Sequence, residues 1–164
     1  MRSKLSLVAC VLLFVLFATG LVQSAAAAPG DDACLLLTQD QLKSALGETV
    51  AAGTHTTPTY LKTCTWKPSS GSTDTLKFLT LNLEGSDRFQ AGKNLMQQSM
   101  PKNATFTQAS GIGDDAYYTI FGTITSLMVK KGSVAFKLAM YGTTSPEKAM
   151  AIEKMLALQV LSKL

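Results

Sequence analysis

The sequence predicts an α+β fold in which helices pack mainly on one face of a twisted antiparallel sheet. Its helical and strand-like segments follow the order α-β-β-α-β-β-β-β-α, so most strands succeed one another through turns instead of alternating with helices. Within residues 133–141 every second side chain, from Val134 to Met140, is large and apolar, which is the pattern of a strand packed on one face. No linker or block of charge divides the chain, and we expect one domain over residues 28–164.

Three helices are predicted from the residues at their ends. Thr38 can cap a helix, Gln41 completes a capping box and Gly47 can end the helix, so the first should cover residues 39–46. The other two are expected from Ser86 or Asp87 to about Ser99, and from Thr144 or Ser145 to near the C-terminus.

Six strands are predicted from β-branched and aromatic composition and from alternation. They cover residues 60–66, 76–83, 105–108, 116–121, 124–130 and 133–141. The first two should form a hairpin across a polar turn, and Lys131-Gly132 should make the turn before the last strand. The segment 76–83 carries apolar residues on both faces, so we expect it near the centre of the sheet.

The N-terminus has the order of a secretory signal. Arg2 and Lys4 precede an apolar run, and the alanines at 25–28 supply small residues for cleavage. We predict a signal peptide over residues 1–27 and a periplasmic or secreted mature domain with no membrane attachment. An uncleaved membrane anchor is the alternative, because about 18 apolar residues can cross a bilayer.

The net charge of the mature chain does not indicate a nucleic-acid partner. Without Arg2 and Lys4, 13 of the 15 lysines and arginines remain against 11 acidic residues, so the net charge is about +2. The positive charges are scattered, and the adjacent pair Lys130-Lys131 is expected at a solvated hairpin tip.

The cysteines indicate one disulfide bond. Removal of Cys10 with the signal leaves Cys34 and Cys64 as a pair in an oxidising compartment, with two free thiols as the alternative. No metal site is predicted, because His55 is the single histidine and no Cys-x-x-Cys spacing offers a zinc ligand set.

Motifs of catalysis and cofactor binding lack their required context. The run Gly111 to Ala116 has the letters of a dinucleotide fingerprint, but strand-like residues follow it where a helix is needed. Asp114 and Asp115 are neighbours on a strand and should point to opposite faces, which does not suit an acid–base pair. No Gly-x-Ser-x-Gly elbow is present. The sequence therefore predicts no catalytic residue and no cofactor.

Aromatic residues on the strands form the candidate binding face. Alternation places Tyr60, Cys64 and Trp66 on one face of the first strand, and Tyr118 and Tyr141 are expected on less buried faces of theirs. Exposed together, the four aromatic side chains would form a binding patch. The alternative places Trp66 in the core over the disulfide.

Several short motifs resemble a broad group of exported bacterial proteins, similar in turn to actinobacterial lipoproteins and to the extracellular sensor domains of some bacterial kinases. The motifs are Asp32-Ala33-Cys34-Leu35-Leu36-Leu37-Thr38, Ala45-Leu46-Gly47, Cys64-Thr65-Trp66 and Gly111-Ile112-Gly113-Asp114-Asp115-Ala116-Tyr117. The resemblance implies a bacterial origin, a bridge between the two cysteines and a sensor-like or ligand-binding role. This chain lacks a usable lipid-anchoring cysteine and a membrane span after the domain, so membrane attachment and signalling are not implied.

We expect an extracytoplasmic ligand-binding or protein-interaction module whose partner is a small molecule or an envelope protein of unknown identity. The alternatives are a secreted hydrolase with an acid-based site, and an envelope-structural or inhibitor protein. An enzyme should show a cleft with convergent polar groups and perturbed acids, whereas a binding module should show an apolar or aromatic groove without them.

Overall fold

A computed structural model describes residues 29–69, 76–143 and 145–164 of the chain. The predicted signal peptide and Cys10 lie outside these residues. The strands are β1 (Thr54–His55), β2 (Thr63–Trp66), β3 (Phe78–Gly85), β4 (Ala104–Ala109), β5 (Asp115–Phe121), β6 (Ile124–Lys131) and β7 (Val134–Tyr141). The helices are a 3-10 turn η1 (Pro29–Asp31), α1 (Ala33–Leu36), α2 (Gln39–Leu46), α3 (Ser86–Ser99) and α4 (Pro146–Leu161).

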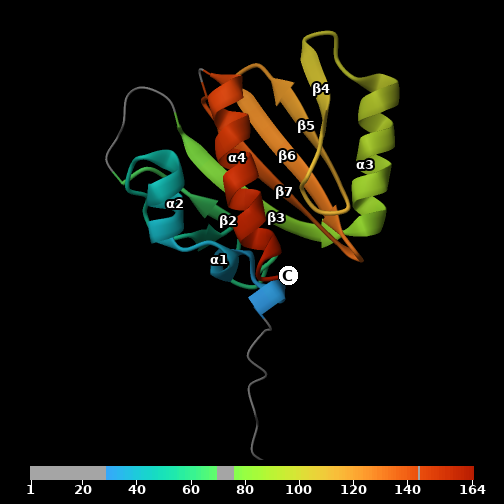
Figure 1. The fold of residues 1–164 in the computed structure, drawn as a ribbon. Coiled ribbons are helices and arrows are strands. Elements are labelled where there is room, and N and C mark those ends of the chain that lie inside the picture. Colours follow the sequence, from blue (N-terminus) through green and yellow to red (C-terminus); the bar gives the residue numbers. More distant parts are fainter. Residues whose placement is uncertain (1–28, 70–75, 144) are drawn as a thin grey trace, which may run out of the picture.

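The strands form one seven-stranded sheet in the order β1-β2-β3-β7-β6-β5-β4, and every neighbouring pair is antiparallel (Figure 1). The predicted α+β class is confirmed. Strand β3 covers Phe78–Gly85, two residues later at each end than the predicted 76–83, so Leu76 lies outside it. It pairs with both β2 and β7, which gives it the expected place near the centre of the sheet. Among the described residues no helix is both long and apolar enough to span a bilayer.

Local end signals account for the helices with few exceptions. The predicted helix 39–46 is α2, and Thr38 and Gln41 form the expected capping box before it. Gly47 ends it with φ 77°, a left-handed conformation that glycine adopts without a Cβ clash. Ser145 caps α4 by accepting a hydrogen bond from the Lys148 amide. The expected cap of α3 is wrong, because Gly85 occupies the cap position and no side chain bonds the first turn.

The first half of the chain contains three elements that the sequence did not predict, namely η1, α1 and β1. Each is only two to four residues long, too short for a periodic pattern. Strand β2 also begins at Thr63, three residues later than expected, because the Tyr60 amide bonds the Thr57 carbonyl in a turn.

Helices cover both faces of the sheet, although three of the four lie on one of them. Phe136 of β7 packs in the main core with side chains of α2 and α4. Its neighbour Ala135 points to the opposite face and packs with Phe89 of α3. Figure 1 shows α4 lying across the front of the sheet and α3 on the right-hand side, well separated from α4. The main core therefore lies between the sheet and the layer of α1, α2 and α4.

Candidate functional site

The structure does not bring the four candidate aromatic residues onto one exposed face. Trp66 and Tyr118 are buried against the helices of the main core, at 1% and 6% exposure. Tyr141 lies on the other face of the sheet and stacks on Phe78, with ring centroids 4.1 Å apart. Tyr60 is exposed but lies outside any strand. The alternation argument failed for Tyr60 because β2 begins only after it.

Trp66 lies in the core, as the alternative interpretation of the sequence predicted, and not on an exposed binding face. Its indole lies close to the disulfide, and Gly53 makes room for both groups. A Cβ added at Gly53 would come within 2.5 Å of Cys64 Sγ and 2.6 Å of Trp66 Nε1. The segment before β1 can therefore approach β2 only with glycine at this position.

Cys34 and Cys64 are joined by a disulfide, with Cα atoms 5.0 Å apart. The predicted pairing is present, and it fits an oxidising environment outside the cytoplasm. The two cysteines differ in accessibility, because Cys64 is fully buried in β2 whereas Cys34 of α1 is only partly buried. The bridge ties α1 to the sheet beside β1.

Two polar side chains gather beside the bridge. His55 Nδ1 lies 3.6 Å from Cys34 Sγ and 3.2 Å from the Thr63 carbonyl oxygen. Its other ring nitrogen, Nε2, lies 3.4 Å from Asp32 Oδ1. Both side chains are largely buried, with 21% of His55 and 15% of Asp32 exposed. The imidazole thus lies between a carboxylate and a sulfur.

Short local elements hold these groups in place. His55 belongs to β1 and pairs directly with Cys64 of β2. Asp32 caps α1, since its Oδ1 accepts a hydrogen bond of 2.8 Å from the Cys34 amide. The carboxylate therefore satisfies a free amide of the first turn and faces the imidazole at the same time.

Within the described ranges, Asp32, Cys34 and His55 also form a group with metal-ligand chemistry, with one candidate ligand atom each within 4.8 Å of the others. The thiolate is the form of cysteine that binds metals, and Cys34 is not a thiolate while it is bonded to Cys64. The closed bridge leaves one nitrogen and one carboxylate ligand, fewer than the four of a structural zinc site.

A hollow of about 320 Å³ opens next to the bridge. We call it the disulfide groove and define it by Cys34, Leu35, Leu37, Thr38, Gln39, Ala52, Gly53 and Trp66. Its volume lies at the lower end of the roughly 300–1,000 Å³ typical of ligand pockets. Most of its walls are apolar, and Leu35 at its side is 57% exposed. The groove thus has room for a small apolar group.

A second, smaller hollow of about 130 Å³ lies between the end of α2 and the start of α4. Its lining includes apolar Met140 and Ile152 together with charged Glu48 and Lys148. This volume is below the range of ordinary ligand pockets. We therefore consider the disulfide groove the better candidate.

Asp114 and Asp115 do not converge on a common site. Asp114 accepts hydrogen bonds from the Gly132 amide at 2.7 Å and from Lys131 at 3.2 Å, and the Gly132 bond is the main reason that its pKa is lowered. Asp115 faces α3, whose Lys93 donates to both of its carboxylate oxygens, at 2.8 and 2.7 Å. The two carboxylates therefore serve different turns and layers. Asp114 lies in the turn before β5 and not on the strand, so the prediction that both are strand neighbours is wrong for Asp114.

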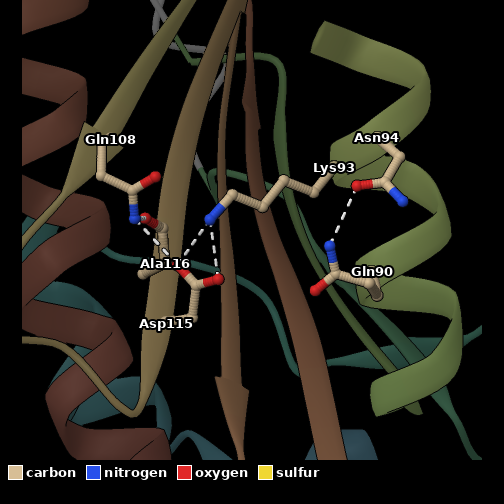
Figure 2. Close-up of polar contacts among 6 residues, drawn as sticks. All are labelled: Gln90, Lys93, Asn94, Gln108, Asp115 and Ala116. Atoms are coloured by element: carbon tan, nitrogen blue, oxygen red, sulfur yellow. Dashed lines mark hydrogen bonds and ion pairs between the residues drawn. The ribbon is translucent and has the colours of Figure 1, made fainter.

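The Asp115 cluster joins α3 to the sheet. Figure 2 shows Lys93 reaching from α3 to Asp115 of β5, with Gln108 of β4 beside it. Gln108 Nε2 donates to Asp115 Oδ1 at 2.8 Å and to the Ala116 carbonyl at 2.7 Å. Burial opposes ionisation of Asp115, but the bonds from Lys93 and Gln108 outweigh it and lower the pKa. With its oxygens engaged, Asp115 is a structural anchor.

The glycine motif before β5 forms a turn, not a nucleotide site. Gly111 and Gly113 have φ of 73° and 59°, and β5 follows them directly. A Cβ at Gly113 would lie 2.4 Å from the Lys130 carbonyl oxygen, so glycine permits the close approach of this turn to β6.

His55 and Asp32 are the site residues that sequence reasoning missed. From the sequence, His55 was considered as a metal ligand, and Asp32 was named only within a short motif, without a role. Only pairing of residues 54–55 with 64–65 brings the histidine to the bridge, and a two-residue strand leaves no periodic signal. One sequence signal could have pointed to this site: Asp32, a residue type that caps helices, lies two residues before Cys34.

Comparison of the chain with models of known protein families and with curated proteins gives no match.

Proposed function

We propose that this protein is an extracytoplasmic binding module that holds a small, largely apolar ligand, or an apolar side chain of an envelope protein, in the disulfide groove. The observation that carries the proposal is a hollow of about 320 Å³ with apolar walls beside a disulfide. The signal-like N-terminus supports export, and the bridge fits an oxidising compartment. The periplasm or the extracellular medium is therefore the proposed location.

The surroundings of the groove also favour binding. Leu35 lies on its rim, and the exposed C-terminal Leu164 lies near Gly30, just before α1. Lys163 donates to the Leu35 carbonyl at 3.3 Å, which brings the end of the chain beside α1. Exposed apolar side chains near an apolar hollow are typical of binding surfaces.

Three acids, Glu153, Asp114 and Asp115, give a hydrolase little support. Glu153 is fully buried, Asp114 accepts from a lysine and a backbone amide, and Asp115 accepts from a lysine and a glutamine side chain. An acid-based hydrolase needs two carboxyl groups that face one substrate from a cleft. These carboxyl groups do not meet that condition.

Trp66 provides the test, because it lines the groove and is the single tryptophan of the chain. We expect the apolar dye 1-anilinonaphthalene-8-sulfonate to change Trp66 emission in a saturable, one-site titration of the folded oxidised protein. Leu35→Ser should weaken binding about fivefold, which corresponds to about 1 kcal/mol of lost apolar contact.

Leu95→Ser is the matched control. Leu95 is 59% exposed, like Leu35 at 57%, but it lies on α3 at the other face of the sheet. Its replacement should leave dye affinity unchanged. The proposal is refuted if Trp66 emission shows no saturable change, or if both leucine variants weaken binding equally.

A further inference from the structure

The two cysteines of the bridge are unequally exposed. Cys64 is fully buried in β2 and lies under Gly53, whereas Cys34 is partly exposed and lines the disulfide groove. In thiol–disulfide exchange the accessible sulfur meets the external compound, and the buried one closes or reopens the internal bond. The structure therefore gives Cys34 the external role and Cys64 the internal one.

His55 lies at the position that a general base for the Cys34 thiol would occupy. Its Nδ1 lies 3.6 Å from Cys34 Sγ, a separation that suits a loosely set nucleophile–base pair without a bound substrate. Asp32 Oδ1 lies 3.4 Å from Nε2. The role of a base at Nδ1 requires the tautomer with its proton on Nε2, on the side of the Asp32 carboxylate. A proton taken up on Nδ1 then finds the Thr63 carbonyl at 3.2 Å as its acceptor.

Asp32 is the ionisable side chain that faces this imidazole in the described part of the chain. The nearby Lys62 is paired with Asp31 at 2.8 Å. A base oriented by a third group is the arrangement that activates a nucleophile in a range of unrelated sites.

We propose that Cys34, Cys64, His55 and Asp32 form a thiol–disulfide exchange site whose substrate is a disulfide compound with an apolar arm. The inference rests on the proposed function, since the disulfide groove holds that arm. Cys34 attacks, Cys64 resolves, His55 moves the proton and Asp32 positions the imidazole.

The reaction starts from the dithiol form of the protein. The Cys34 thiol gives its proton to His55 Nδ1, and the thiolate attacks one sulfur of the substrate R–S–S–R′. A bond forms between Cys34 and R–S, the substrate disulfide breaks, and R′–S⁻ leaves and takes the proton from His55. Cys64 then attacks Cys34 Sγ and re-forms the internal bridge. R–S⁻ leaves and takes up the proton of the Cys64 thiol.

Each turnover thus oxidises the protein dithiol to a disulfide and reduces the substrate disulfide to two thiols, with two electrons transferred. An external thiol reverses the same steps and restores the dithiol. Its thiolate attacks Cys34 Sγ, because Cys64 Sγ is buried.

The test uses two variants that keep one sulfur of the bridge each. Cys64→Ser retains the groove-facing Cys34, and Cys34→Ser retains the buried Cys64. The probe is 5,5′-dithiobis(2-nitrobenzoate), an aromatic disulfide whose thiol product is coloured. At pH 6.5 we expect Cys64→Ser to react at least 100-fold faster than Cys34→Ser, because burial protects the remaining sulfur of the second variant.

His55 is tested in the Cys64→Ser background. His55→Gln should slow the reaction at least tenfold at pH 6.5 and leave it unchanged at pH 9.5, where an ordinary thiol with a pKa of about 8.5 ionises without a base. Asp32→Asn keeps the helix cap and should slow the reaction less than His55→Gln does. Asp31→Asn, one residue away and paired with Lys62, is the control and should not change the rate.

A second measurement uses the oxidised protein without cysteine variants. Opening the bridge with reduced glutathione, followed by acid trapping and peptide mass spectrometry, should place glutathione on Cys34 alone. Glutathione in equal amounts on Cys34 and Cys64, or a reaction at pH 6.5 that is independent of His55, would overturn the exchange site. The dye titration uses the closed bridge, so retained dye binding would leave the proposed function standing if exchange fails.

Discussion

Replacement of the buried Glu153 by glutamine should stabilise the protein in a strongly pH-dependent way. Glu153 lies on the sheet-facing side of α4, is fully buried, and neither carboxyl oxygen forms a hydrogen bond of standard geometry among the described residues; the Met140 backbone gives it only a weak polar contact. Burial raises its pKa from the ordinary value of 4.5 to about 8, and the Met140 backbone and the charge of Lys137 offset only part of this effect. Tyr118 shares this environment, since its own burial and then Glu153 raise its pKa.

The magnitude follows from the two proton equilibria. The unfolded chain ionises Glu153 above about pH 4.5, whereas the folded protein keeps the carboxyl neutral up to about pH 8. The side chain therefore costs nothing below pH 4.5, an increasing amount between pH 4.5 and 8, and a constant amount above pH 8. At about 1.36 kcal/mol for each pKa unit, the cost is roughly 3 kcal/mol at pH 7 and roughly 5 kcal/mol above pH 8.

Urea unfolding of both proteins between pH 4 and 9 measures this cost. Glutamine has the shape of the neutral carboxyl, so Glu153→Gln should match the wild type at pH 4 and exceed it by about 3 kcal/mol at pH 7 and about 5 kcal/mol at pH 9. Glu147→Gln, at the exposed start of the same helix, is the control and should change stability by less than about 0.5 kcal/mol. A difference between Glu153→Gln and wild type that does not grow from pH 5 to 8.5 would refute the reasoning.

Three other perturbations test the packing of the fold. Trp66→Ala should cost about 3 to 5 kcal/mol in urea unfolding, because the indole is buried at 1% exposure; a loss below 1 kcal/mol would contradict its core position. Reduction of the Cys34–Cys64 bridge, which closes a separation of 30 residues, should cost roughly 3 to 4 kcal/mol, and an unchanged melting temperature would contradict this. Lys93→Met should cost about 1 to 2 kcal/mol at pH 7, because it leaves Asp115 partly buried without its cation. Hydrogen bonds keep the pKa of Asp115 below its ordinary 3.8, so this loss should fade as the pH falls below 3.8, and a loss that persists at pH 2 would count against the pair.

Much of the fold was predictable because its signals are local or periodic. The helix 39–46 was predicted with its observed bounds, since the capping box at Thr38 and the stop at Gly47 act within one turn of the chain. The four strands of the second half were predicted within one residue of their ends, because each spans six to eight residues and alternates or carries β-branched side chains. Their consecutive order also determined the antiparallel class.

The candidate site was predictable only in its covalent part. The pair Cys34 and Cys64 follows from cysteine number and compartment, which need no coordinates. The aromatic face was a poor guide, because alternation tells which residues share a face but not which helix covers that face. Trp66 and Tyr118 are covered by the α4 layer, and Tyr141 lies on the other side.

By itself, the sequence determined the signal-like N-terminus, the α+β class, the element order after residue 76 and the cysteine pair. Each of these depends on composition or on interactions within a few residues. Only the tertiary structure decided that His55 lies between Asp32 and Cys34, that an apolar groove opens at the bridge, and that α4 buries Glu153. These features join residues more than 20 positions apart through a two-residue strand, a short helix and the packing of a helix on the sheet. Such contacts are fixed by long-range packing, which leaves no periodic trace in the chain.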